Sequence, residues 1–125
     1  MPSYIAMSLR PASKASQHVL ALDYEIVQEQ ASALGRLGRA LEAALAALAE
    51  YDRLHRDDRG SLEQTAQRAR ARLVQDAGDA LWCFMVQREA CGLRDPRPVL
   101  RDYRVPPEVQ NRMGIFTDRR RTTSA

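Results

Sequence analysis

Three features of the 125-residue sequence predict an all-α fold. The stretch from Leu20 to Leu54 contains no proline and repeats apolar residues at spacings of three and four, the period of a helix that packs on a helix. Ser61–Gln64 has the form of a capping box, and Gly92 closes a second apolar-periodic stretch. The sequence therefore predicts a long antiparallel helical hairpin followed by two short C-terminal helices.

The first helix is expected over residues 20–54. Its seam extends back to Val27 and Leu20, and Ile26 and Ala31 widen it. Gly35 and Gly38 each weaken a helix, so both are candidates for a close helix crossing. The positions of this helix predicted to pack on neighbouring helices are Leu34, Leu37, Leu41, Ala44 and Leu48.

The second helix is expected from the N-cap Ser61 to about Cys91. Residues 80–86 are apolar all round the helix, and a two-helix hairpin alone does not cover such a segment. We therefore expect other elements to pack on Trp82 and Val86, and Cys83 to be an inert thiol in the core. The predicted packing positions of this helix are Leu73, Ala80, Trp82 and Phe84.

Two proline signatures predict the short C-terminal helices. Asp95-Pro96 and Pro106-Pro107 each place proline at the start of a helix, which predicts helices over 96–103 and 107–113. The predicted division of the chain is a flexible arm over 1–16, a single helical domain over 17–115 and a disordered basic tail over 116–125.

The length of the first helix favours a homodimer. A helix of about 35 residues is about 50 Å long, whereas a compact globule of this size is about 36 Å across. The hairpin would leave an apolar stripe uncovered, so two hairpins are expected to pair into a four-helix-type bundle with the character of a coiled coil.

Composition argues against several classes of protein. The longest apolar runs, Ala43–Ala49 and Ala80–Val86, have seven residues, and a membrane span needs about 20. The N-terminus lacks the apolar stretch of a secretory signal, and two cysteines form no disulfide framework. A cytoplasmic protein without membrane partners is the expectation.

Nucleic-acid binding is disfavoured despite the net charge of +3. The basic groups gather in the second half of the chain, at Arg68, Arg70 and Arg72 and in the tail Arg119–Arg121. No binding motif accompanies them, and the sequence offers no platform of aromatic residues for stacking bases. A charged, solvated helix face is the simpler interpretation.

Motifs for catalysis are missing from the sequence. It contains no Gly-rich phosphate loop, nucleophile elbow, HExxH or CxxC. The two histidines, His18 and His55, flank the first helix, and Asp52 with His55 is only a fragment of a metal site. We therefore expect no catalytic residue, no metal and no cofactor.

One polar corner is a candidate ligand site. Residues 87–95 concentrate charges directly after the most apolar run. A small pocket there would use Arg88 as an anion anchor, with Glu89, Cys91 and Tyr103 around it. The alternative is an Arg and Glu network that pins the turn and caps the helix. Both interpretations stay open at this point.

The sequence resembles a family of short, uncharacterised bacterial helical proteins of unknown function. The resemblance covers about residues 7–115 and implies a helical fold without an activity, cofactor or substrate. It rests on Leu22-Asp23-Tyr24-Glu25, on Gln87–Asp95, and on Tyr103, Pro106, Glu108-Val109, Arg112 and Gly114.

The expected function is protein–protein interaction, carried out by a small homodimer without catalytic chemistry. A partner other than a second copy of the chain is also compatible with the sequence. A protein that binds a small molecule or anion near residues 87–103, possessing enzyme activity or not, is the first alternative. Nucleic-acid binding through the arginine-rich surface and tail is the second.

Overall fold

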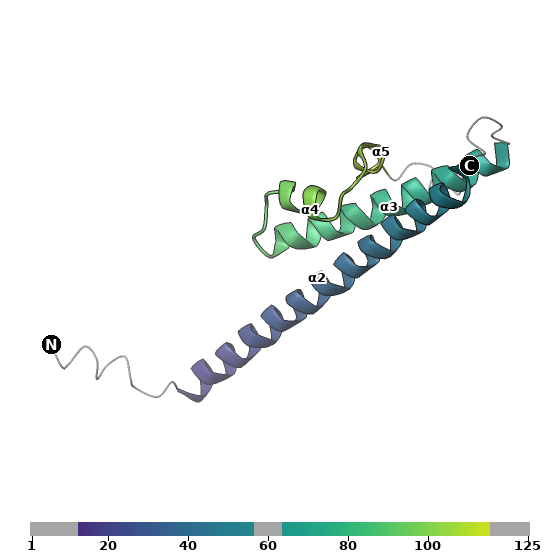
Figure 1. Cartoon of the computed structure of the whole chain (residues 1–125). Helices are drawn as coiled ribbons and strands as arrows, with labels where there is room; N and C mark the ends of the chain where they lie inside the picture. Colours follow the sequence, from purple (N-terminus) through teal and green to yellow (C-terminus); the bar gives the residue numbers. More distant parts are fainter. Residues whose placement is uncertain (1–12, 57–63, 116–125) are drawn as a thin grey trace, which may run out of the picture. The chain divides into compact units, whose positions relative to one another are not determined.

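The structure is a computed structural model that describes residues 13–56 and 64–115. Four helices and no strand lie within these ranges, which confirms the all-α prediction (Figure 1). They are α2 (Lys14–Leu54), α3 (Gln64–Ala90), α4 (Arg97–Asp102) and α5 (Pro107–Gln110). The chain divides into two compact units, Met1–Ser32 and Ala33–Ala125, and each is described by itself.

The first unit contributes residues 14–32 of α2. The helix begins six residues before the predicted start at Leu20, because Ser13 acts as its N-cap. The Ser13 hydroxyl oxygen accepts a hydrogen bond from the Ser16 backbone N–H at 3.2 Å. Residues 14–16, which were predicted to be part of a flexible arm, are therefore helical. Residues 1–12 of that arm lie outside the described residues.

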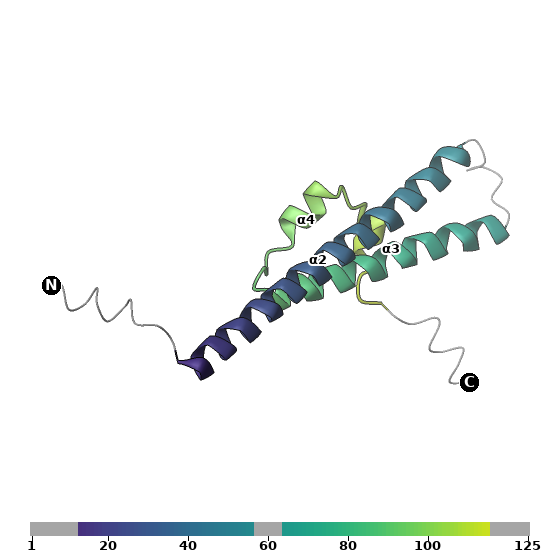
Figure 2. The same cartoon turned by 90° about the horizontal axis from the view of Figure 1, so that it is seen from below.

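The second unit begins with the predicted hairpin, in which residues 33–54 of α2 run antiparallel to α3 (Figures 1 and 2). Near the end of α2, the Tyr51 hydroxyl donates a hydrogen bond to the Ala66 carbonyl at 2.9 Å. At the far end, a Cβ on Gly38 would lie 3.4 Å from the Phe84 ring. The prediction of an antiparallel hairpin is confirmed. The predicted N-cap Ser61 lies outside the described residues.

The core of the second unit is apolar and draws on all four helices. Leu41 from α2, Leu81 from α3 and Val109 from α5 are its largest fully buried side chains. Of the nine predicted packing residues, Trp82 is the exception, with 40% of its surface exposed. The other eight belong to this core or pack against it: Leu34, Leu37, Leu41, Ala44, Leu48, Leu73, Ala80 and Phe84.

Helix α3 ends at a glycine as predicted. Gly92 has a φ of +87°, its N–H donates to Glu89 O, and the Leu93 N–H donates to Arg88 O. This pair of bonds is a Schellman motif. Helix α4 ends in the same way with Arg104 at the equivalent position, where its φ of 51° is rare for a residue with a side chain.

The C-terminal segment covers the expected face of α3 only in part, since a Cβ on Gly114 would lie 3.4 Å from the Trp82 ring. Trp82 and Val86 are 40% and 47% exposed, and Cys83 is exposed rather than part of the core. At Gly78, an added Cβ would lie 2.9 Å from Arg112 Cβ. The missing side chain lets the segment after α5 approach α3 closely at Gly78, while Trp82 and Val86 keep part of their surface exposed.

None of the helices in the described ranges combines the length and apolar character required to cross a membrane.

Candidate functional site

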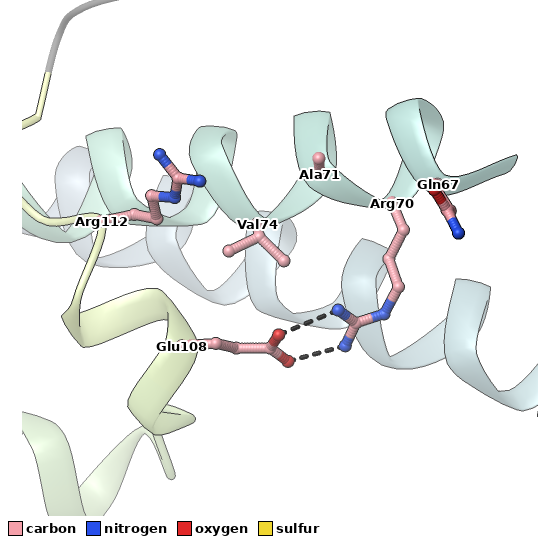
Figure 3. Close-up of a pocket in the computed structure, with 6 residues that line it drawn as sticks. All are labelled: Gln67, Arg70, Ala71, Val74, Glu108 and Arg112. Carbon is pink, nitrogen blue, oxygen red and sulfur yellow. Dashed lines mark hydrogen bonds and ion pairs between the residues drawn. The ribbon is translucent and has the colours of Figure 1, made fainter. Parts of the chain in front are cut away.

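Arg70 is the centre of a charged cluster that joins three helices. Its guanidinium donates to Asp52 of α2, at 2.8 Å from Nε and 3.1 Å from Nη2. It also donates to Glu108 of α5, at 2.8 Å from Nη1 and 2.6 Å from Nη2 (Figure 3). Each carboxylate thus receives two hydrogen bonds, the geometry in which an arginine–carboxylate pair is strongest.

The cluster stabilises the charged form of Arg70. The hydrogen bonds that Arg70 donates to Glu108, and then those that it donates to Asp52, raise the pKa of the Arg70 guanidinium above its ordinary value. The side chain of Arg70 is 31% exposed, and those of Asp52 and Glu108 are 27% and 45% exposed. Water therefore screens the cluster in part, and its main effect is to fix the position of α5 against the hairpin.

A shallow cavity of about 420 Å³ lies beside this cluster. Val74 and Ala71 form an apolar base, and Arg112 lies at the other end with its side chain turned away from Glu108 (Figure 3). The cavity is lined by Gln67, Arg70, Ala71, Val74, Glu108 and Arg112. These six residues supply hydrogen-bond donors, hydrogen-bond acceptors and charge, which suit the binding of a polar group.

The predicted ligand corner is only partly assembled. Arg88 Cζ lies 5.9 Å from the centre of the Phe84 ring, and the Tyr103 ring meets the same Phe84 edge-on at 5.5 Å. Glu89 is exposed, and the half-buried Cys91 lies 3.8 Å from the side-chain amide of Gln87.

Hydrogen bonding at this corner stabilises the turn that follows α3. Arg88 Nη2 donates to the Asp95 carbonyl at 3.0 Å, and the backbone oxygen of Arg88 accepts from Leu93 in the Schellman motif. Arg88 Nε is buried without a partner among the described residues. These contacts favour the interpretation of the corner as a network that pins the turn.

Tyr103 lines a different cavity from the predicted one. It forms a cavity of about 480 Å³ between α2 and α4, together with Glu42, Leu45 and Asp102. Its hydroxyl would lie 2.8 Å from a Cβ on Gly38. Gly38 therefore does mark a close approach, but of a tyrosine rather than of a second helix.

The fragment Asp52–His55 has other contacts in the structure. Asp52 binds Arg70, and the His55 ring stacks on Tyr51 with centroids 4.1 Å apart. Within residues 13–56 and 64–115, no three His, Cys, Asp or Glu side chains are grouped closely enough to hold a metal ion.

The Arg70 cluster was missed in the sequence because each member was assigned to another pattern. Arg70 was counted with Arg68 and Arg72 as a basic run, and Asp52 with His55 as a metal fragment. A usable signal existed for one pair, since Asp52 and Arg70 lie at similar distances on either side of the predicted turn at Gly60-Ser61. No comparable signal links Glu108 to them.

Comparison with known proteins identifies the family. No curated protein and no solved structure matches the chain. A family model does match, and it covers residues 5–121. This range includes every helix described above. The chain belongs to a family of unknown function (DUF6665).

Proposed function

We propose that this chain is a cytoplasmic, non-catalytic protein-interaction module that self-associates as a homodimer. The observation that carries the proposal is a set of exposed large apolar side chains on one face of residues 19–27. Each of these side chains is between 54% and 64% exposed. We call this set the N-terminal apolar face; it consists of Val19, Leu20, Tyr24, Ile26 and Val27.

The five residues occupy one broad side of the helix. At 3.6 residues per turn they fall within an arc of about 160°. The opposite side carries Glu25, Lys14 and the small residue Ala21. This is the pattern of a helix that buries one face against another surface.

Exposure of this face is costly in water. Contiguous apolar patches of a few hundred Å² on a protein surface mark interaction sites. Most of the stability of a helix in a protein also comes from packing of its apolar face. A partner that covers residues 19–27 would therefore stabilise both the face and the helix.

A second copy of the chain is the occupant that we propose. Five side chains of this size, each more than half exposed, leave on the order of 500 Å² per copy, so two copies reach the roughly 1,000 Å² of a specific interface. A cytoplasmic location accords with the two cysteines, Cys83 and Cys91, which are both free thiols.

The test compares two adjacent residues of the same helix. Leu20→Asp puts a charge into the N-terminal apolar face, whereas Ala21→Asp puts the same charge outside it. The wild type and Ala21→Asp are expected to give a particle of twice the 14.1 kDa chain mass by light scattering or native mass spectrometry, and Leu20→Asp a monomer. A wild-type monomer at micromolar concentration with both long helices intact contradicts the proposal.

A further inference from the structure

We infer that the N-terminal apolar face of one copy docks on a second exposed surface, around Trp82, in the second unit of another copy. The inference rests on the proposed self-association and specifies which surfaces meet. In a twofold dimer the contact forms twice, once in each direction. We call the acceptor surface the Trp82 face; it consists of Trp82, Val86 and Ile115.

The three residues of the Trp82 face lie together. Trp82 and Val86 are one turn apart on α3, so their side chains share a side of the helix. A Cβ on Gly114 would lie 3.4 Å from the Trp82 ring. Ile115 is the residue that follows Gly114, so its backbone starts next to this contact. Gln75 Nε2 also donates to the Ile115 carbonyl at 2.8 Å, which holds this segment against α3.

The side chains of the Trp82 face are partly exposed to solvent. Trp82, Val86 and Ile115 are 40%, 47% and 37% exposed, although the rest of the large apolar side chains of α3 pack in the core. A tryptophan beside a β-branched residue, with a charged rim, has the composition of an interface centre. The N-terminal apolar face is an apolar surface that would bury the exposed part of these side chains.

The charges of the two units are complementary. Residues 13–32 contain three carboxylates, Asp23, Glu25 and Glu29, and one basic side chain, Lys14. The described residues of the second unit contain 13 arginines and nine carboxylates. Contact between the first unit of one copy and the second unit of another is therefore favoured electrostatically over contact between like units.

Asp23 disfavours a contact between the N-terminal apolar faces of two copies. At 100° per residue it lies between Val19 and Leu20 on the helix, inside the N-terminal apolar face. Two such faces packed on each other would enclose two like charges, which is unfavourable. A surface with a nearby arginine would compensate Asp23.

Arg112 supplies that positive charge at the edge of the Trp82 face. Its Cβ lies 2.9 Å from the place of a Cβ on Gly78, one turn before Trp82 on α3. Its side chain turns away from Glu108, which binds Arg70 (Figure 3). Across residues 13–56 and 64–115, no carboxylate lies within ion-pair distance of Arg112. Arg112 is thus available to pair with Asp23 of a second copy.

The first experiment measures the dimer dissociation constant of Val86→Asp by analytical ultracentrifugation. Val86 is nearly half exposed, so aspartate is tolerated in the monomer, and circular dichroism checks the fold. We expect the dissociation constant to rise roughly tenfold or more, as for Leu20→Asp. Ala69→Asp is the matched control, an exposed α3 position away from this face, and should leave the constant unchanged.

Mixing the two variants tests whether the N-terminal apolar face contacts the Trp82 face of another copy or the same face of that copy. A Leu20→Asp copy keeps an intact Trp82 face, and a Val86→Asp copy keeps an intact N-terminal apolar face. A mixed pair therefore retains one of the two contacts. It should form at concentrations where neither variant pairs with itself. Isotope labelling of one variant distinguishes the mixed pair from the two homodimers. If Val86→Asp dimerises normally while Leu20→Asp does not, the Trp82 face is not the acceptor, and self-association still stands.

A charge exchange tests the Asp23–Arg112 pair. Asp23→Arg and Arg112→Asp should each weaken the dimer, and the double variant should recover affinity because the pair is rebuilt with reversed signs. Additive losses in the double variant would contradict the pairing of these residues.

Cys83 provides a probe of whether the contact lies between copies. It is an exposed thiol next to Trp82. In a Cys91→Ser background, Ala31→Cys adds a thiol on the side of α2 that carries Leu20 and Val27. A short bismaleimide should then link two chains through the added thiol and Cys83. A link confined to single chains would show that the face closes on its own second unit, which would overturn the inference.

Discussion

Helix α2 contains the same apolar seam twice, once with side chains exposed and once with side chains buried. Leu20 and Val27 are more than half exposed, whereas Leu41 and Leu48, which continue the seven-residue spacing, are almost fully buried. The residue types and their period are alike in both parts. The difference teaches that a periodic apolar pattern marks the face of a helix that is able to pack, while burial requires an opposing surface. Helices α3, α4 and α5 supply that surface to the second part.

The largest expected effect comes from truncating the same residue type in both parts. Leu41→Ala should lower the free energy of unfolding by about 3 kcal/mol, since Leu41 is fully buried and its loss leaves a cavity. Leu20→Ala should lower it by less than about 1 kcal/mol at concentrations where the chain is monomeric. Urea denaturation measures both. Equal losses would mean that Leu20 is as well packed within its own chain as Leu41.

Removing the charge of Arg70 tests whether its hydrogen bonds to Asp52 and Glu108 hold α3 and α5 against the packed part of α2. Arg70→Met keeps most of the aliphatic stem but leaves Asp52 and Glu108 without their shared cation. We expect a loss of about 1–2 kcal/mol, at the lower end for charged hydrogen bonds because the groups are partly exposed. Arg72→Met, an exposed arginine of the same helix, is the control. A wild-type stability that does not fall with added salt would argue against a contribution from this cluster.

Two glycines, Gly35 and Gly38, lie where the packed part of α2 begins, and alanine at the two positions should have different effects on stability. A Cβ on Gly35 would meet only the Arg39 side chain, so Gly35→Ala should raise stability by about 0.5–1 kcal/mol through helix propensity. A Cβ on Gly38 would lie 2.8 Å from the Tyr103 hydroxyl. This overlap in Gly38→Ala should cancel the gain in stability or lower the stability by up to about 1 kcal/mol. Thermal unfolding measures both. Adding Tyr103→Phe to Gly38→Ala should restore the gain, because it removes the overlapping oxygen.

The smallest effect concerns the pH dependence of the turn before α4. Hydrogen bonds from the Arg97 side chain, and then from its backbone N–H, lower the pKa of Asp95 to about 2 from an ordinary value of 3.8. Since the pKa is lowered in the folded state, the stabilisation is complete above about pH 4 and is lost as the pH falls toward 2.

The measurement is an NMR titration of the Asp95 carboxyl group. In Arg97→Gln its pKa should move back toward the ordinary value, and the acid-induced loss of stability between about pH 4 and 2 should shrink. A titration of Asp95 that does not respond to this substitution would assign the shift to another group.

Prediction from the sequence succeeded where the signal lies within a few turns of chain. The apolar period of α2, the glycine after α3 and the prolines before α4 and α5 were each read from adjacent residues, and each marks an element that the structure contains. It failed for the start of α2, where Ser13 was counted as part of the arm. It also failed for Trp82 and Cys83, since the part of α3 that stays exposed depends on contacts such as that of Gly78 with Arg112, 34 residues apart in the chain.

The sequence by itself determined that this chain is helical, that its two long helices end near Leu54 and before Gly92, and that these two helices form an antiparallel hairpin. These features follow from hydrogen bonding and side-chain spacing within short segments of the chain. The tertiary structure alone decided that Arg70 joins Asp52 to Glu108, that Tyr103 meets Gly38 and that Trp82 stays exposed. The physical reason is that such contacts depend on how closely two backbones approach and in which register, and sequence spacing does not encode either quantity.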